Sequence, residues 1–119
     1  GSCKSKRSRL VGSGLYGVEM SEDKFGYGVW YRKPEFRNVA PVKRDLLKTH
    51  TYICEVFKAS NLEDVFIRMQ GEIWSPNGEA RSLIQAFGLD HTSMDIGDVV
   101  ADPNGNLWVV AATGFERLP

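Results

Sequence analysis

The residues with the most chemical potential lie close together near the end of the chain. Asp90, His91, Thr92 and Ser93 are consecutive, and Asp98 follows five residues later. Serine, histidine and aspartate are the residue types of a nucleophile, its base and the group that orients the base. Members of such a triad act from separate elements that converge in space, which near-neighbours in sequence do with difficulty. We therefore expect no catalytic residues and a protein that is not an enzyme.

Two other interpretations of this turn stay open. In the first, the hydroxyl of Thr92 or Ser93 satisfies backbone groups, and Asp98 or His91 is hydrogen-bonded across the turn. In the second, the same side chains contact a ligand. The placement of these residues distinguishes the two: buried and mutually bonded side chains are structural, whereas side chains that line an open cleft form a site.

A second group of candidates lies between two predicted helices. Trp74 and Asn77 precede the second helix, and Arg81 lies in its first turn. The amide groups at a helix start suit an anion, but Glu79 already supplies negative charge there. The segment is either a helix connection with Trp74 in the core or a recognition loop. The candidate binding residues are Trp74, Asn77, Arg81, His91, Thr92, Ser93 and Asp98.

Charge is distributed unevenly along a chain whose net charge is zero. Residues 1–48 hold eleven Lys and Arg against five Asp and Glu, and residues 49–119 hold four against ten. The halves therefore carry +6 and −6. Either the basic half packs on the acidic half, or it offers a basic face to nucleic acid or to an acidic protein.

Nucleic acid binding is the alternative function that this charge indicates. A basic, serine-rich arm at the start of the chain would contact phosphate in a salt-sensitive way. A later run mixes aromatic and cationic side chains, as single-strand binders do, although alternating aromatics are also typical of the core face of a sheet. The residues for this alternative are Lys4, Lys6, Arg7, Arg9, Tyr27, Trp30, Arg32 and Lys33.

Metal, cofactor and membrane functions find no support in the composition. The only histidines are His50 and His91, and the aspartates around His91 lack the ligand spacing of a calcium loop. The two cysteines, Cys3 and Cys54, have neither metal spacing nor the density of a disulfide scaffold. We expect a reducing compartment, a buried Cys54, no metal and no cofactor. No apolar run approaches the roughly 20 residues of a membrane span.

The elements that must position these residues form one domain, because 119 residues are enough for a single core. We predict a flexible basic arm over 1–14 and one α+β domain over 15–119. Strands are expected over 15–20 and 25–32, joined by a polar turn. The proline-containing segment 33–41 is expected to be an extended loop, and a helical turn over 42–47 and a strand over 48–57 follow.

The second half of the domain has the clearest pattern. Ser60 and Glu63 form a capping box before a helix over 62–70, whose apolar positions are Leu62, Val65, Phe66 and Met69. Ser75 or Asn77 would cap a second helix that ends at Gly88, with Ala80, Leu83, Ile84 and Phe87 on its apolar face. Asn104-Gly105 predicts a hairpin between 97–101 and 107–111, and 114–118 closes the sheet. The predicted fold is a mostly antiparallel sheet with two consecutive helices between a central strand and a C-terminal hairpin.

The C-terminal half resembles a family of small uncharacterised proteins carried by bacteriophages and plasmids. The resemblance rests on Asn77-Gly78-Glu79-Ala80-Arg81, His91-Thr92-Ser93-Met94, Gly97-Asp98-Val99 and Gly114-Phe115. It covers the part of the domain from 48 to 119, with the motifs after residue 62. The sequence departs from the family pattern at Asp95, where the family usually has serine. The resemblance implies a cytoplasmic protein of a bacterial host cell and no catalytic residues.

Together these observations predict a non-enzymatic accessory protein of a phage or plasmid. It would bind a host or phage macromolecule, such as a defence or nucleic-acid-processing factor. The alternative is a nucleic-acid-binding module that uses the basic N-terminal half.

Overall fold

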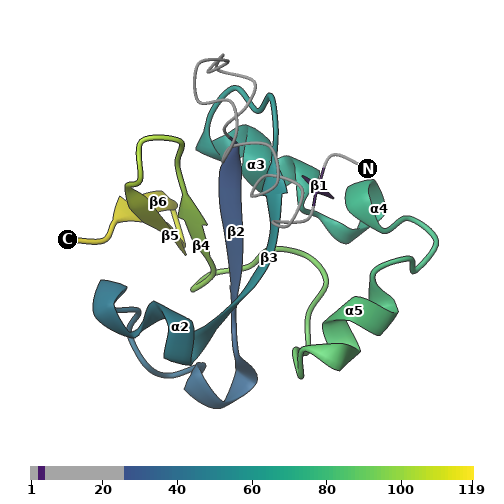
Figure 1. Ribbon diagram of the computed structural model, residues 1–119, viewed down its shortest axis with the longest axis horizontal. Helices are drawn as coiled ribbons and strands as arrows, with labels where there is room; N and C mark the ends of the chain where they lie inside the picture. The colour runs from purple at the N-terminus through teal and green to yellow at the C-terminus, as the bar shows by residue number, and fades with distance from the viewer. Residues whose placement is uncertain (1–2, 5–25) are drawn as a thin grey trace, which may run out of the picture.

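The computed structural model describes residues 3–4 and 26–119, and it confirms the predicted α+β class. Six antiparallel strands form one sheet in the order β1-β3-β2-β4-β5-β6 (Figure 1). The strands are β1 (Cys3–Lys4), β2 (Tyr27–Arg32), β3 (His50–Val56), β4 (Val99–Ala101), β5 (Leu107–Ala111) and β6 (Gly114–Arg117). The predicted strand over 15–20 and its turn lie outside the described residues, as does the predicted arm apart from β1.

Strand alternation divides β2 between the two faces of the sheet. Val29 and Tyr31 are fully buried in the main core, beneath the helices that follow β3, and Tyr27 packs against the same core. Trp30 faces the other side, where it packs on a smaller cluster that includes Leu46. The aromatic residues of β2 are therefore not on one face, because successive side chains of a strand point in opposite directions.

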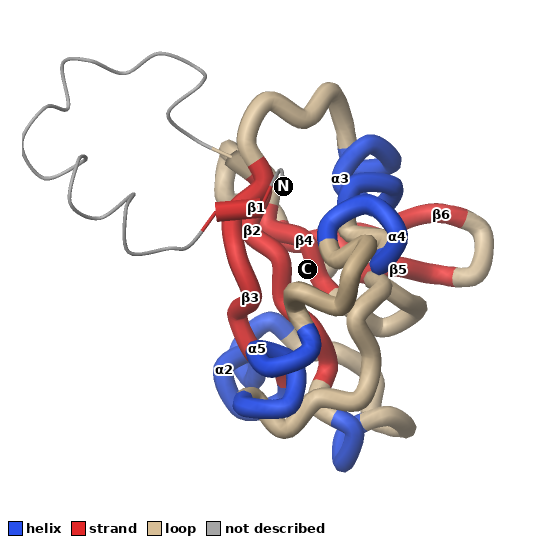
Figure 2. The backbone as a smooth tube through the Cα atoms, turned by 90° about the vertical axis from the view of Figure 1, so that its right-hand side faces the viewer, coloured by secondary structure: helices blue, strands red, loops and turns tan. Residues whose placement is uncertain are grey.

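Helical segments lie before and after β3. Two 3-10 turns, η3 (Pro34–Phe36) and η4 (Lys43–Asp45), and helix α2 (Leu46–Thr49) connect β2 to β3. The extended loop predicted over 33–41 is thus partly wrong, because Pro34 occupies the first turn of η3, a position that its fixed φ favours. After β3 come α3 (Leu62–Arg68), α4 (Gly71–Trp74) and α5 (Arg81–Ala86), of which α4 is a short addition to the two predicted helices. Figure 2 shows α3 and α4 on one side of β2 and β3.

The start of α3 differs from the predicted capping box by one residue. Asn61, and not Ser60, is the N-cap, and its side-chain oxygen accepts the backbone N–H of Asp64 at 2.9 Å. The Asp64 carboxylate in turn accepts the N–H of Ser60 at 2.9 Å. The pair of bonds resembles a capping box, but the return bond comes from Ser60, the residue before the cap, and not from Asn61. Glu63 takes no part and lies exposed on the helix surface.

The second predicted helix begins later than expected. Ser75 Oγ accepts the N–H of Ala80 at 2.8 Å, but α5 itself has no side-chain cap. Its apolar face is only partly buried, since Leu83 and Phe87 are 38% and 39% exposed. Gly88 ends the helix with a φ of +70°, as the sequence predicted, because a left-handed residue lets the last carbonyls be satisfied.

Cys54 is buried, as expected, but it is not a free thiol. Because Cys54 is disulfide-bonded, it gives no support to the expected reducing compartment. Cys3–Lys4 pairs with the end of β3, so this short part of the predicted arm belongs to the sheet. Of the helices formed by the described residues, none has the length and apolar character needed to cross a membrane.

Candidate functional site

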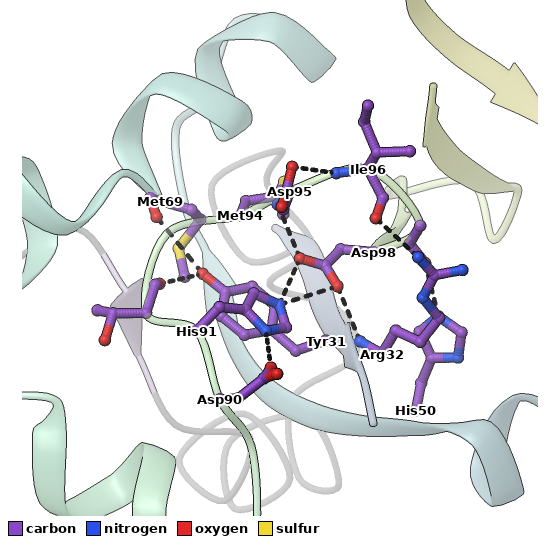
Figure 3. A network of polar contacts seen from close by, with 12 residues as sticks. Tyr31, Arg32, His50, Met69, Asp90, His91, Met94, Asp95, Ile96 and Asp98 are labelled. Atoms are coloured by element: carbon purple, nitrogen blue, oxygen red, sulfur yellow. Dashed lines mark hydrogen bonds and ion pairs between the residues drawn. The ribbon is translucent and has the colours of Figure 1, made fainter. Parts of the chain in front are cut away.

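In the turn that links α5 to β4, several groups are hydrogen-bonded to one buried carboxylate. Asp98, 1% exposed, accepts hydrogen bonds from the backbone N–H of Arg32 at 2.8 Å and of Asp95 at 2.8 Å. The ring nitrogen Nε2 of His91 lies 2.9 Å from the same carboxylate (Figure 3). Asp98 thus joins the end of β2 to the turn, which are far apart in the sequence. The basic and acidic halves meet here, and β2 itself lies between β3 and β4.

His91 is held between two carboxylates. Its Nδ1 lies 3.1 Å from Asp90, opposite the contact with Asp98, and its ring stacks on Tyr31 with centroids 4.6 Å apart. Burial alone would lower the pKa of His91, but the hydrogen bonds and charges of Asp98 and Asp90 outweigh it and raise the pKa. Both ring nitrogens face acceptors, an arrangement that favours the doubly protonated imidazolium.

Ser93, through its hydroxyl, and Thr92, through its backbone carbonyl, connect the turn to α4 and to β2. Ser93 Oγ accepts the N–H of Gly71 at 2.7 Å, at the start of α4. The backbone carbonyl of Thr92 accepts from the Tyr31 hydroxyl at 2.6 Å and from the Trp74 indole at 3.0 Å. Trp74 and the turn therefore brace each other, through the backbone of Thr92.

This geometry does not assemble a triad. Both nitrogens of His91 are directed at carboxylates, so neither faces the hydroxyl of Ser93, which is bonded to a backbone N–H. A general base must reach the proton that it abstracts. The three residue types that suggested chemistry in the sequence are placed as a scaffold.

The pKa of the second histidine, His50, is shifted in the opposite direction. His50 Nε2 lies 2.8 Å from the carbonyl of Gly97, and its Nδ1 lies 2.7 Å from the hydroxyl of Thr49. Burial is the largest influence and lowers the pKa of His50. Gly97 has a φ of +96°, and a side chain there would overlap the guanidinium of Arg32. The second half of the turn is therefore fixed from both sides.

An open cleft lies beside this scaffold. It has a volume of about 380 Å³ and places cations from the basic half opposite the acidic turn. Arg37 forms an ion pair with Asp90 across it. The charged and polar residues that line it are Arg32, Lys33, Arg37, Asp90, His91, Asp95 and Asp98. His91 is partly exposed at one edge of this cleft, whereas Asp98 is buried behind it.

Four of the remaining candidates, Asn77, Arg81, Tyr27 and Trp30, do not line this cleft. Asn77 bonds to Glu79 through its backbone N–H at 2.9 Å, and Arg81 packs over Gly78. Tyr27 and Trp30 are on opposite faces of the sheet, whereas Arg32 and Lys33 line the cleft. The side chains of Lys4, Lys6, Arg7 and Arg9 lie outside what the structure describes.

A surface that the sequence did not indicate runs between α3 and the β5–β6 hairpin. It consists of two adjoining cavities, of about 430 and 360 Å³, which share Glu63 and Phe115 as lining residues. We call this surface the α3–hairpin groove. Its apolar lining is Tyr27, Leu62, Phe66, Ile96, Trp108, Val110 and Phe115. Leu62 and Phe66 carried the helical periodicity, which predicted burial but not that one side of each would stay open.

The charges of the groove are all of one sign. Glu63, Asp95 and Asp102 line it, and no lysine or arginine of the described chain does. Asp102 accepts hydrogen bonds from two backbone N–H groups and from the Trp108 indole at 3.0 Å. These bonds outweigh the effect of burial and lower the pKa of Asp102, so the carboxylate stays ionised.

Within the described ranges, 3–4 and 26–119, no three His, Cys, Asp or Glu side chains are placed to hold a metal ion. Comparison of the chain with protein-family models, with curated proteins and with solved structures found no match. The resemblance to mobile-element proteins therefore stays a prediction.

Proposed function

We propose that this chain is a non-enzymatic accessory protein of a phage or plasmid that works by docking on a host or phage protein. The observation that supports docking most strongly is the α3–hairpin groove. Aromatic side chains are enriched in the cores of protein interfaces, and this groove presents four of them, Tyr27, Phe66, Trp108 and Phe115. The mobile-element context, and with it the bacterial cytoplasm, rests on the sequence resemblance alone.

Two features of the turn around His91 favour binding over catalysis. Its polar side chains are used in holding the sheet to the helices, and Asp95 and Ile96 form a shared wall between the cleft and the groove. The backbone of this wall is held by hydrogen bonds from Asp95 to Asp98 and from Arg32 to Ile96. Such bonds suit docking, because less conformational entropy is lost on binding when the surface is already ordered.

Affinity capture with a matched pair of variants tests the proposal. Ala112 is exposed in the groove, and Leu47 is 80% exposed on α2. Ala112→Arg and Leu47→Arg add the same charge at these two places. We expect the wild type and Leu47→Arg to recover the same identified protein from a bacterial host lysate, and Ala112→Arg to lose it. Equal recovery by all three proteins, or no protein above background, would count against docking at the groove.

Nucleic acid remains the second candidate, because three cations of the basic half, Arg32, Lys33 and Arg37, line one cleft. Affinity driven by phosphate contacts is greatest at low salt. A gel shift at about 50 mM salt tests this function. No shift with single-stranded DNA or RNA would eliminate it. If binding occurs, replacing Lys4, Lys6, Arg7 and Arg9 by alanine should weaken it and flatten its salt dependence.

A further inference from the structure

The aromatic end of the α3–hairpin groove is built in a way that suits a positive charge. Tyr27, Trp108 and Phe115 line one cavity together with the carboxylates of Glu63 and Asp102. The faces of aromatic rings attract lysine and arginine side chains, and the attraction is stronger where water is excluded. Carboxylates at the rim add a charge of the complementary sign.

The adjoining cavity has a different character. Phe66, Val110 and Phe115 give it an apolar lining, and Asp95 stands at its edge. Because Phe115 and Glu63 belong to both cavities, one short segment of chain can reach both. An occupant with a cationic side chain next to an aliphatic or aromatic one would match this order of surfaces.

The charge of the groove is not neutralised by the described part of the protein. Glu63 is exposed and forms no ion pair with any described residue. The side chain of Arg68, on the same helix, is bonded instead to Asp64 and to the carbonyls of Phe57 and Lys58. Arg117, on β6, donates to the side chain of Asn106. Among the residues that the structure describes, the lining of this groove thus contains carboxylates but no lysine or arginine.

We infer that the α3–hairpin groove binds a basic segment of the partner protein, with a lysine or arginine between Tyr27, Trp108 and Phe115 and a neighbouring apolar residue against Phe66 and Val110. The inference rests on the proposed docking function and specifies the chemistry of the partner. The acidic character of the groove also favours a protein over a nucleic acid as its ligand, because carboxylates repel the phosphates of nucleic acid.

Two synthetic peptides serve as probes for an NMR titration of the full chain. One is a capped heptapeptide in which lysine alternates with leucine, and the other has glutamate in place of every lysine. The lysine peptide should shift the indole N–H signal of Trp108 and the amide signals of Glu63 and Ala112, without shifting that of Leu47. Its affinity should fall as salt is raised. The glutamate peptide should leave these signals in place.

Charge reversal provides the matched variants. Glu63 lies in the groove, whereas Glu72 is exposed on α4 outside it. Glu63→Lys and Glu72→Lys change the net charge equally. Losing one exposed ion pair and gaining a repulsion of similar size should weaken binding of the lysine peptide about fivefold for Glu63→Lys. For Glu72→Lys the change should stay within about twofold.

Three results would overturn the inference. They are equal binding of the two peptides, equal weakening by the two variants, and groove signals that do not move with either peptide. A fourth concerns the basic arm of this chain. If alanine at Lys4, Lys6, Arg7 and Arg9 moves the Trp108 signal in the absence of peptide, the arm and not a partner occupies the groove.

The capture experiment and the peptide titration can fail separately, so the inference and the proposed docking function are tested independently. If Ala112→Arg abolishes capture of an identified partner while the two peptides bind alike, docking at the groove stands and the basic character of the partner is wrong. If the lysine peptide binds the groove but no partner depends on Ala112, the chemistry of the groove stands and the proposed docking function fails.

Discussion

Replacing Asp98 by alanine removes the acceptor on which donors from two distant parts of the chain converge. The backbone N–H groups of Arg32 and Asp95 would each lose a 2.8 Å hydrogen bond at a site that is 1% exposed. A buried donor left unsatisfied costs about 1–3 kcal/mol. His91 would lose a charge-assisted bond as well, which is worth about 1.5–3 kcal/mol. Because these contributions overlap, we expect a total loss of about 4 kcal/mol.

Urea unfolding followed by circular dichroism measures this loss, provided that the slope with denaturant is unchanged. Asp98→Asn should cost about half as much, because the amide keeps one oxygen to accept a bond. Asp95→Ala is the control, since Asp95 lies exposed in the same turn, and it should cost less than about 1 kcal/mol. A loss for Asp98→Ala below about 1 kcal/mol, or equal to that of the control, would refute the idea that Asp98 is the structural centre of the turn.

Three further predictions concern the residues around this carboxylate. The pKa of His91 is raised in the folded protein, so its charged form stabilises the fold fully below its unfolded pKa of about 6.5 and loses this effect as pH rises through the folded value. The difference in unfolding free energy between the wild type and His91→Gln should therefore shrink from pH 5.5 to 9. A constant difference would contradict the contact of His91 with two carboxylates. Tyr31→Phe removes the 2.6 Å bond to the Thr92 carbonyl and should cost about 1 kcal/mol in the same assay, with no cost arguing against that bond. Gly97→Ala should cost about 1–2 kcal/mol, because a side chain is strained at a φ of +96°, whereas the overlapping guanidinium of Arg32 ends a flexible side chain and can move. A near-neutral variant would show that the backbone conformation at Gly97 does not constrain the turn.

Local patterns predicted the elements well where one segment carries its own signal. The spacing of Leu62, Val65 and Met69 predicted α3, and the turn around Gly105 predicted the β4–β5 hairpin. Both signals are short-range, because they depend on residues that are neighbours in one helix or one turn. The N-cap of α3 lies at Asn61, one residue later than predicted, because a short-range pattern does not locate the end of a helix to the exact residue.

The candidate site was predicted less completely, because its parts come together only in the folded sheet. The turn from Asp90 to Asp98 was recognised, and the structural interpretation agrees with the hydroxyl of Ser93, which satisfies a backbone N–H. Thr92 differs, because its contacts are made by the backbone carbonyl. The pairing of Asp98 with Arg32 was not predictable, since the two are 66 residues apart. The groove was missed for the same reason: no local pattern brings Phe115 of the last strand to the surface of α3.

Site-specific photocrosslinking in cells shows directly whether a partner protein docks on the α3–hairpin groove. A photoreactive residue placed at Ala112, in the groove, is compared with one at Leu47 on α2, and both proteins are irradiated in bacterial host cells. We expect one discrete crosslinked protein from position 112, joined through a segment rich in lysine or arginine, and none from position 47. A crosslinked product from position 47 alone, or the same products from both positions, would contradict it.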